Sequence, residues 1–319
     1  MDILRFSPIL KTVVWGGGRI APLKGIETCQ THIGESWELS GVPGNVSVVE
    51  GGPFDGKPLD ELLRRFGPRL AGSRSGEDFP LLVKFIDAAG DLSIQVHPDD
   101  ALALRLHGPG FRGKSEMWYV VDAAPGAFLY AGLSRPITPS EYERRVADGT
   151  ITEVLARHEV HPGDVFYLPA GRIHAICAGC LIAEIQQSSD LTYRIFDYNR
   201  PGLDGKPREL HTDKAKQAID YTVHSSYRTT YVPAANRRVE LVKCPFFTTS
   251  LYEVDAPLTE DISGLDSFLV VICVEGSGTL ESDGSSAAFR RGQTLLIPAE
   301  NRNFRILPDG PCRLLTSSL

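Results

Sequence analysis

The chain of 319 residues carries a net charge of −7, with 42% hydrophobic and 23% charged residues, a balance typical of globular proteins. This acidic charge argues against binding to nucleic acid or to a membrane surface, because both favour basic patches. The apolar runs are too short to cross a bilayer, no secretory signal is evident, and six cysteines are too few for a disulfide scaffold, so we expect a cytoplasmic protein.

Short runs rich in β-branched and aromatic residues recur along the chain, separated by many of its 31 glycines and 22 prolines. Examples are DLSIQVHP at 91–98, EMWYVVDA at 116–123, DVFYLPAG at 164–171 and SFLVVICVEG at 267–276. Short strands at such close spacing indicate a sandwich or barrel rather than a parallel α/β sheet. We therefore predict a mainly β fold.

Helical patterns are confined to a few segments. Residues 57–72 place leucines and a phenylalanine on one helical face. Residues 138–160 begin with a plausible cap at Thr138 or Ser140 and predict one or two short helices, and residues 211–223 are a third candidate. We expect these helices to be insertions in the β fold.

Two segments far apart in the chain have glycine and proline at the same relative positions. HPGDVFYLPAGRIHA at 161–175 and RRGQTLLIPAENRNF at 290–304 repeat a glycine and a proline at the same spacing, and Asn303 falls where His174 stands. This repetition predicts two related β-barrels, of which only the first has a histidine at its mouth. The predicted domains are a metal-binding catalytic domain with helical insertions at 1–225 and a metal-free domain at 226–319.

Side chains that are able to bind a metal gather in three segments. Alternation along a strand puts Gln95 and His97 on one face, Glu116 opens an apolar strand, and His174 ends the 161–175 motif. This mixed set of nitrogen and oxygen ligands suits Zn²⁺, Fe²⁺ or Mn²⁺ and lacks the thiolates of a structural zinc site. The other histidines are interpreted as packed or surface residues, and the Cys177/Cys180 pair as small buried residues in a strand turn.

Four segments then resemble the hallmark sequences of the type I mannose-6-phosphate isomerase family, in its short bacterial form. They are PLLVKFIDAAGDLSIQVHPDD at 80–100, GKSEMWYV at 113–120, PGDVFYLPAGRIHAI at 162–176 and AEIQQSSDLTYRIFDYNR at 183–200. The resemblance implies two cupin-like jelly-roll barrels and one zinc ion per chain, held by Gln95, His97, Glu116 and His174. It further implies interconversion of D-mannose 6-phosphate and D-fructose 6-phosphate through a zinc-assisted enediol(ate).

Several charged residues near these segments suit a phosphorylated substrate. Arg194 resembles the family's active-site arginine, and Lys114 and Arg200 are candidates to hold the phosphate by charge-assisted hydrogen bonds. Glu184 and Lys84 are the candidate proton-transfer bases, and we expect a divalent cation to lower the pKa of a desolvated Lys84.

Two other functions remain open at this point. One is an Fe²⁺-dependent oxygenase on the same scaffold, and the other is a non-catalytic protein that binds sugar phosphates. The four mixed ligands, with lysines and arginines around them, suit a phosphate ester as the substrate better than they suit an oxygenase. We therefore expect a small sugar phosphate as the partner, no nucleic acid or membrane, and a monomer or weak homodimer.

Overall fold

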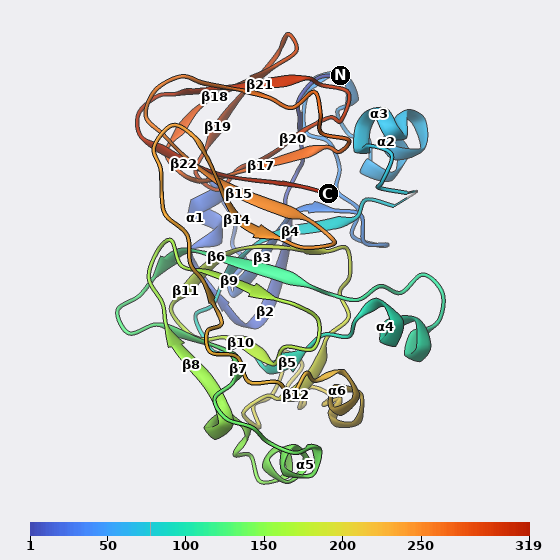
Figure 1. Cartoon of the computed structure of the whole chain (residues 1–319), viewed down its shortest axis with the longest axis vertical. Helices are drawn as coiled ribbons and strands as arrows, with labels where there is room; N and C mark the ends of the chain where they lie inside the picture. Colours follow the sequence, from blue (N-terminus) through green and yellow to red (C-terminus); the bar gives the residue numbers. More distant parts are fainter. Residues whose placement is uncertain (77) are drawn as a thin grey trace.

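The computed structural model describes residues 1–76 and 78–319 as two lobes that follow one another along the long axis of the molecule (Figure 1). Each lobe is a pair of antiparallel sheets that face one another. The first lobe has a seven-stranded sheet in the order β13 (Arg228–Thr229), β9 (Val165–Leu168), β6 (Glu116–Ala123), β11 (Cys180–Gln187), β4 (Leu81–Asp87), β3 (Ile33–Ser40) and β2 (Ile9–Gly17). Its second sheet has five strands in the order β12 (Tyr193–Phe196), β5 (Ile94–Val96), β10 (His174–Ile176), β7 (Phe128–Leu133) and β8 (Leu155–Glu159).

The second lobe repeats this arrangement with ten strands. Its six-stranded sheet has the order β1 (Leu4–Arg5), β20 (Thr294–Ile297), β17 (Leu269–Glu275), β22 (Cys312–Ser318), β15 (Thr248–Val254) and β14 (Arg238–Lys243). Its four-stranded sheet has the order β16 (Leu258–Asp261), β21 (Asn303–Pro308), β18 (Ser277–Ser282) and β19 (Ser285–Arg290). Facing antiparallel sheets are the arrangement of double-sheet jelly rolls, and the predicted mainly β class is confirmed.

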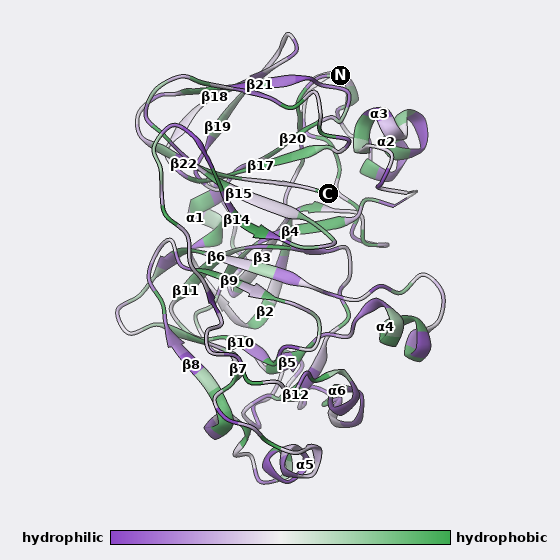
Figure 2. Cartoon of the chain, in the orientation of Figure 1, coloured by the Kyte–Doolittle hydropathy of each residue, from purple (hydrophilic) through white to green (hydrophobic). Residues whose placement is uncertain are grey.

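Three hydrophobic layers hold the four sheets together. One fills the first lobe, with Trp118 and Phe166 among its members, and another fills the second lobe around Phe304. The largest lies between the lobes, where Phe85 of the seven-stranded sheet and Ile272 of the six-stranded sheet belong to one cluster. Figure 2 shows the hydrophobic colouring of β17 at this junction, while α5 and α6 on the outside carry hydrophilic residues. The two central sheets are therefore covered on both faces.

The helices match the predicted segments in part. The first segment forms α2 (Leu59–Phe66) and α3 (Pro68–Ala71), and the third forms α6 (Thr212–Ala218). The second forms α5 (Pro139–Ala147) and the 3₁₀ helix η2 (Ile151–Val154), and its remaining residues belong to strand β8. The Thr138 hydroxyl accepts a hydrogen bond from the Glu141 N–H at 3.1 Å, which confirms one of the two predicted caps. Two helices and a short 3₁₀ turn were not predicted: α1 (Ile20–Lys24), α4 (Asp100–His107) and η1 (Gly52–Phe54).

The repeated glycine and proline occupy matching places in the two lobes. Gly163 precedes β9 with φ of 93°, and Gly292 precedes β20 with φ of 85°, a backbone region that favours glycine. A proline ends each strand, and the next strands, β10 and β21, belong to the opposite sheets. The echo in the sequence therefore corresponds to the same turn from one sheet to the other in both lobes.

Each lobe also takes a strand from the other side of the predicted domain boundary. The N-terminal strand β1 pairs with β20 of the second lobe, with Leu4 opposite Leu296. Strand β13, which follows the predicted domain boundary, pairs with β9 of the first lobe. Within residues 1–76 and 78–319, no helix has the length and hydropathy needed to span a membrane.

Candidate metal and substrate site

The four predicted ligands lie between the two sheets of the first lobe. Gln95 on β5 and His174 at the start of β10 are register partners in the five-stranded sheet. His97 follows β5 directly, and Glu116 opens β6 in the facing seven-stranded sheet. The structure therefore brings together residues that lie up to 79 positions apart in the sequence.

Three of these side chains form a compact buried group. The ligand atoms of His97, Glu116 and His174 all lie within 4.8 Å of one another. His97 Nε2 is 3.4 Å from Glu116 Oε2, and His174 Nε2 is 3.2 Å from Glu116 Oε1. Gln95 Nε2 is 3.2 Å from His174 Nε2, so the carboxamide lies next to the ligand atoms of this group.

Backbone carbonyls orient both imidazole rings. Nδ1 of His97 lies 2.9 Å from the Leu191 carbonyl oxygen, and Nδ1 of His174 lies 2.8 Å from that of Arg172. A carbonyl oxygen can only accept, so each Nδ1 carries the proton and each neutral ring presents the lone pair of Nε2 to Glu116. Such hydrogen bonds are typical of metal-binding histidines.

The charges of the group also suit a cation. Burial lowers the pKa of His97 to about 3 and lowers the pKa of His174, so both rings stay neutral. Burial alone would raise the pKa of Glu116, but Lys114 and the two histidines outweigh it and hold this pKa well below its usual range. Both carboxylate oxygens are fully buried; Oε1 has no hydrogen-bond partner among the described residues, and Oε2 has only the ammonium group of Lys114 within 2.8 Å. An ionised carboxylate beside two neutral imidazoles fits a divalent metal.

A cavity of about 360 Å³ opens next to the group. Five of the predicted site residues line it: Lys84, Gln95, Lys114, Glu184 and Arg194. Lys114 Nζ lies 3.2 Å from His97 Nε2 and 2.8 Å from Glu116 Oε2, so it connects the cavity to the buried group. The metal-binding and cationic residues therefore belong to one site.

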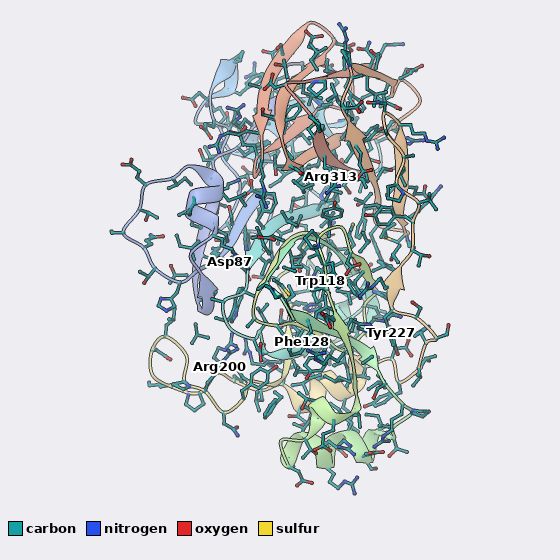
Figure 3. The ribbon with its side chains drawn as sticks, turned by 90° about the vertical axis from the view of Figure 1, so that its left-hand side faces the viewer. Asp87, Trp118, Phe128, Arg200, Tyr227 and Arg313 are labelled. Carbon is teal, nitrogen blue, oxygen red and sulfur yellow. The ribbon has the colours of Figure 1, made fainter. Side chains whose placement is uncertain are left out.

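Arg200 does not line this cavity. Its guanidinium pairs with Asp197 at 2.9 Å, and Figure 3 places it at the edge of the first lobe, whereas Trp118 lies inside. Asp197 also accepts two hydrogen bonds from Arg208, at 2.7 and 2.6 Å, and Arg208 does line the cavity. One carboxylate thus positions both arginines.

Lys84 and Glu184 occupy the wall formed by the seven-stranded sheet. Lys84 Nζ is 3.2 Å from Glu184 Oε1 and 3.8 Å from Glu35 Oε2. Although burial opposes it, these carboxylates raise the pKa of Lys84 in the metal-free protein, whereas the prediction from the sequence concerned Lys84 beside a bound cation. The pKa of Glu184 is raised, chiefly by burial and then by the negative charge of nearby Glu116. Lys84 acts in the opposite direction but does not outweigh them.

Three further cavity residues were not singled out from the sequence. Glu35 sits beside Lys84, Trp118 donates its Nε1–H to Glu184 Oε2 at 2.8 Å, and Arg208 reaches the cavity from the segment after β12. Glu35 and Trp118 carried a usable signal, because strand alternation turns them to the inner face. Arg208 lies in an irregular segment, where spacing predicts no direction.

Comparisons with known proteins identify the family of this chain. Residues 3–113 match the phosphomannose isomerase type I catalytic domain, and residues 237–319 match the mannose-6-phosphate isomerase cupin domain. The mannose-6-phosphate isomerase ManA of Bacillus subtilis is 34% identical, with 97% of each chain covered, and that of Streptococcus mutans is 34% identical, with 95% of this chain and 94% of the relative covered.

A solved structure agrees over the full length. The crystal structure of the mannose 6-phosphate isomerase from Bacillus subtilis superimposes with a TM-score of 0.91 at 31% identity, covering 100% of both chains. These similarities in sequence and in fold show that the chain belongs to the type I phosphomannose isomerase family.

Proposed function

We propose that this protein interconverts D-mannose 6-phosphate and D-fructose 6-phosphate. The observation that carries the proposal is the buried group of His97, Glu116 and His174 beside a cavity lined by Lys84, Lys114 and other cations. The metal-competent group suits a substrate with a carbonyl and a neighbouring hydroxyl, and the cations suit its phosphate. The family assignment supports the same reaction.

The proposed ligands of the metal are Gln95, His97, Glu116 and His174, and the proposed metal is Zn²⁺, one per chain. Gln95 would bind the metal through its amide oxygen. The amide nitrogen faces His174 in the structure, and rotating the carboxamide by half a turn puts the oxygen in its place. When bound, the cation would supply Lewis acidity toward the substrate's carbonyl and hydroxyl oxygens.

Glu184 is the proposed base for moving the proton between C2 and C1. Its raised pKa brings a carboxyl group closer to neutral pH, where a general base works best. Lys84 stays protonated beside it and is assigned to positioning Glu184 and to balancing negative charge in the enediol(ate). Lys84 is therefore the weaker of the two candidates for the base.

The phosphate is proposed to meet the cations at the cavity wall. The Nε atom of Arg194 is buried and has no hydrogen-bond partner among the described residues, so this guanidinium can still bind a substrate oxygen. Lys114 and Arg208 line the same cavity, and Arg200 supports Arg208 through Asp197. We propose that the enzyme acts in the cytoplasm as a monomer or weak homodimer, and its six free cysteines are consistent with a reducing compartment.

A coupled assay for fructose 6-phosphate tests the proposal. We expect turnover of mannose 6-phosphate by the zinc-loaded protein, its loss after chelation, and its return when zinc is restored. Absence of turnover with zinc restored would contradict the isomerase and support a binding role. Oxygen uptake by the iron-loaded protein would support the oxygenase instead.

A further inference from the structure

A second cavity lies in the second lobe, where the described residues form no group able to hold a metal ion. It has a volume of about 250 Å³ and opens between β15, β22 and the segment 262–265 that follows β16. Phe304 and Leu269 of the second-lobe core line it, so it reaches into the space between the two sheets. The seven-stranded and six-stranded sheets lie between it and the site in the first lobe (Figure 1).

The lining of this cavity is rich in hydroxyl groups. Ser250 of β15 is the register partner of Thr316 of β22, and Thr248 is the partner of Ser318, so two hydroxyl pairs face inward. Ser250, Thr316 and Ser318 are only 5%, 4% and 6% exposed. Most of the remaining interior of this lobe is filled by apolar side chains.

The opposite face of the same strands, which is buried between the two lobes, provides a comparison. Thr249 and Ser317 are neighbours of the inward pair, and the Thr249 Oγ1 donates to Ser317 Oγ at 3.1 Å. Among the described residues, no hydrogen bond joins the Ser250 and Thr316 hydroxyls, although these two residues are register partners. Both residues line the cavity, and neither hydroxyl oxygen is among the fully buried side-chain atoms that lack a partner, so both are open to the space of the cavity. The inward hydroxyls are therefore available to a molecule in the cavity.

Size and charge restrict what this molecule can be. A volume of 250 Å³ is far more than one water needs, and lies just below the range of about 300–1,000 Å³ for drug-sized ligands. Arg238 and Asp261 both line the cavity, so their charges oppose one another and favour a neutral ligand over a phosphate ester. Tyr252 and Phe304 add aromatic surface, so the lining combines apolar contact with several hydroxyl groups.

We propose that the cavity of the second lobe binds a small neutral polyhydroxylated molecule of monosaccharide size. The hydroxyl pairs of β15 and β22 would exchange hydrogen bonds with the ligand's own hydroxyls. Arg238 and Asp261 would hold its outer end. The second lobe would then have a ligand of its own, separate from the phosphorylated substrate of the first lobe.

Binding of D-mannose and D-fructose to the zinc-loaded protein tests this proposal. Saturation-transfer NMR is recorded with fructose 6-phosphate in excess, so that the first-lobe site is occupied. Thr316→Val removes one inward hydroxyl at constant volume, Ser250→Leu fills the cavity, and Thr249→Val is the matched control on the opposite face. We expect dissociation constants in the millimolar range, at least tenfold weaker in the first two variants and unchanged in the control.

Isomerase activity reports on folding in all three variants, since none of these residues belongs to the first-lobe site, and we expect it to stay unchanged. The proposal is overturned if neither sugar binds to the unmodified protein, if only water occupies the cavity in crystals soaked with D-mannose, or if binding survives both inward substitutions in active protein.

Discussion

Lys84 and Glu184 face one another on neighbouring strands of the seven-stranded sheet, with Nζ 3.2 Å from Oε1. On the other side of Glu184, its register partner Trp118 donates to Oε2 at 2.8 Å. Three adjacent strands thus fix one carboxylate between an indole and an ammonium group. Because all three side chains are buried, the carboxylate keeps one orientation toward the cavity.

Replacing Glu184 with glutamine is expected to lower kcat by about 10²- to 10⁴-fold, the usual contribution of a general base. KM for mannose 6-phosphate should change little, because the amide keeps the size of the side chain and its contact with Trp118. Solvent exchange of the C2 proton, followed by NMR, checks the role directly. Retained exchange in this variant would eliminate Glu184 as the sole base.

Replacing Lys84 with methionine separates positioning from proton transfer. Loss of the ammonium group removes an influence that lowers the pKa of Glu184, so that pKa should rise further. The base is active when deprotonated, and the acid limb of the pH–rate profile should therefore move to higher pH, with exchange restored at alkaline pH. Complete loss of exchange at every pH would instead assign the base to Lys84.

Chelation is expected to remove both activity and stability. A cation bound only by the folded state stabilises it by about 2.7 kcal/mol at a hundredfold excess over its Kd. Glu116→Gln keeps the volume of the side chain but removes the charge between His97 and His174, so we expect loss of the metal by elemental analysis. Chelated wild-type protein regains activity with added zinc, whereas the variant should not. A variant that retained a full complement of metal would contradict the proposed ligand set.

The β-rich class and the metal-competent group could be predicted because both depend on local patterns. Alternation along β5 sets the direction of Gln95, and the glycine and proline around β9 mark the turn that leads to His174. Neither needs knowledge of distant contacts. The four candidate ligands chosen in this way also stand at the positions that the family's motifs imply.

Features that depend on long-range pairing could not be predicted in this way. Strand β1 joins a sheet of the second lobe, and no local pattern in two residues reveals a partner near residue 296. The carboxylates of Glu35 and Glu184, which raise the pKa of Lys84 in the metal-free protein, reach it only when three strands pair. Helix α4 was overlooked although Asp99 caps it by accepting the Leu102 N–H at 2.7 Å.

The buried histidines predict how the stability of the metal-free protein depends on pH. The pKa of His97 is about 3 when folded and about 6.5 when unfolded, so the unfolded chain binds more protons between these values. The contribution of His97 to the free energy of unfolding is therefore complete above pH 6.5, and it is lost as the pH falls toward 3. His97 alone should lower the free energy of unfolding by about 2 kcal/mol between pH 7 and pH 5. Urea denaturation with chelator present measures this change, and His97→Gln should flatten it; an equal slope in both proteins would contradict this account.

The contact between the lobes predicts a loss of stability with no change in chemistry. The ammonium group of Lys24 in α1 is buried against Glu38 of β3 and donates to the Gly292 carbonyl of the second lobe, while Ser36 Oγ donates to Glu38 Oε1 at 2.5 Å. Lys24→Met leaves the buried carboxylate without its cation, which typically costs about 3–5 kcal/mol. Thermal and urea unfolding of the zinc-loaded protein measure this loss, while kcat of the folded fraction should stay the same.

The double variant Lys24→Met with Glu38→Gln isolates the cause. The amide removes the unpaired buried charge but leaves the lost hydrogen bond to Gly292 unreplaced, so we expect the double variant to recover part of the stability. Recovery of about half or more would assign the loss mainly to the uncompensated carboxylate. If the double variant were as unstable as the single one, the contribution of Lys24 would instead come from its bond to the Gly292 carbonyl, and hence from holding the second lobe against the first.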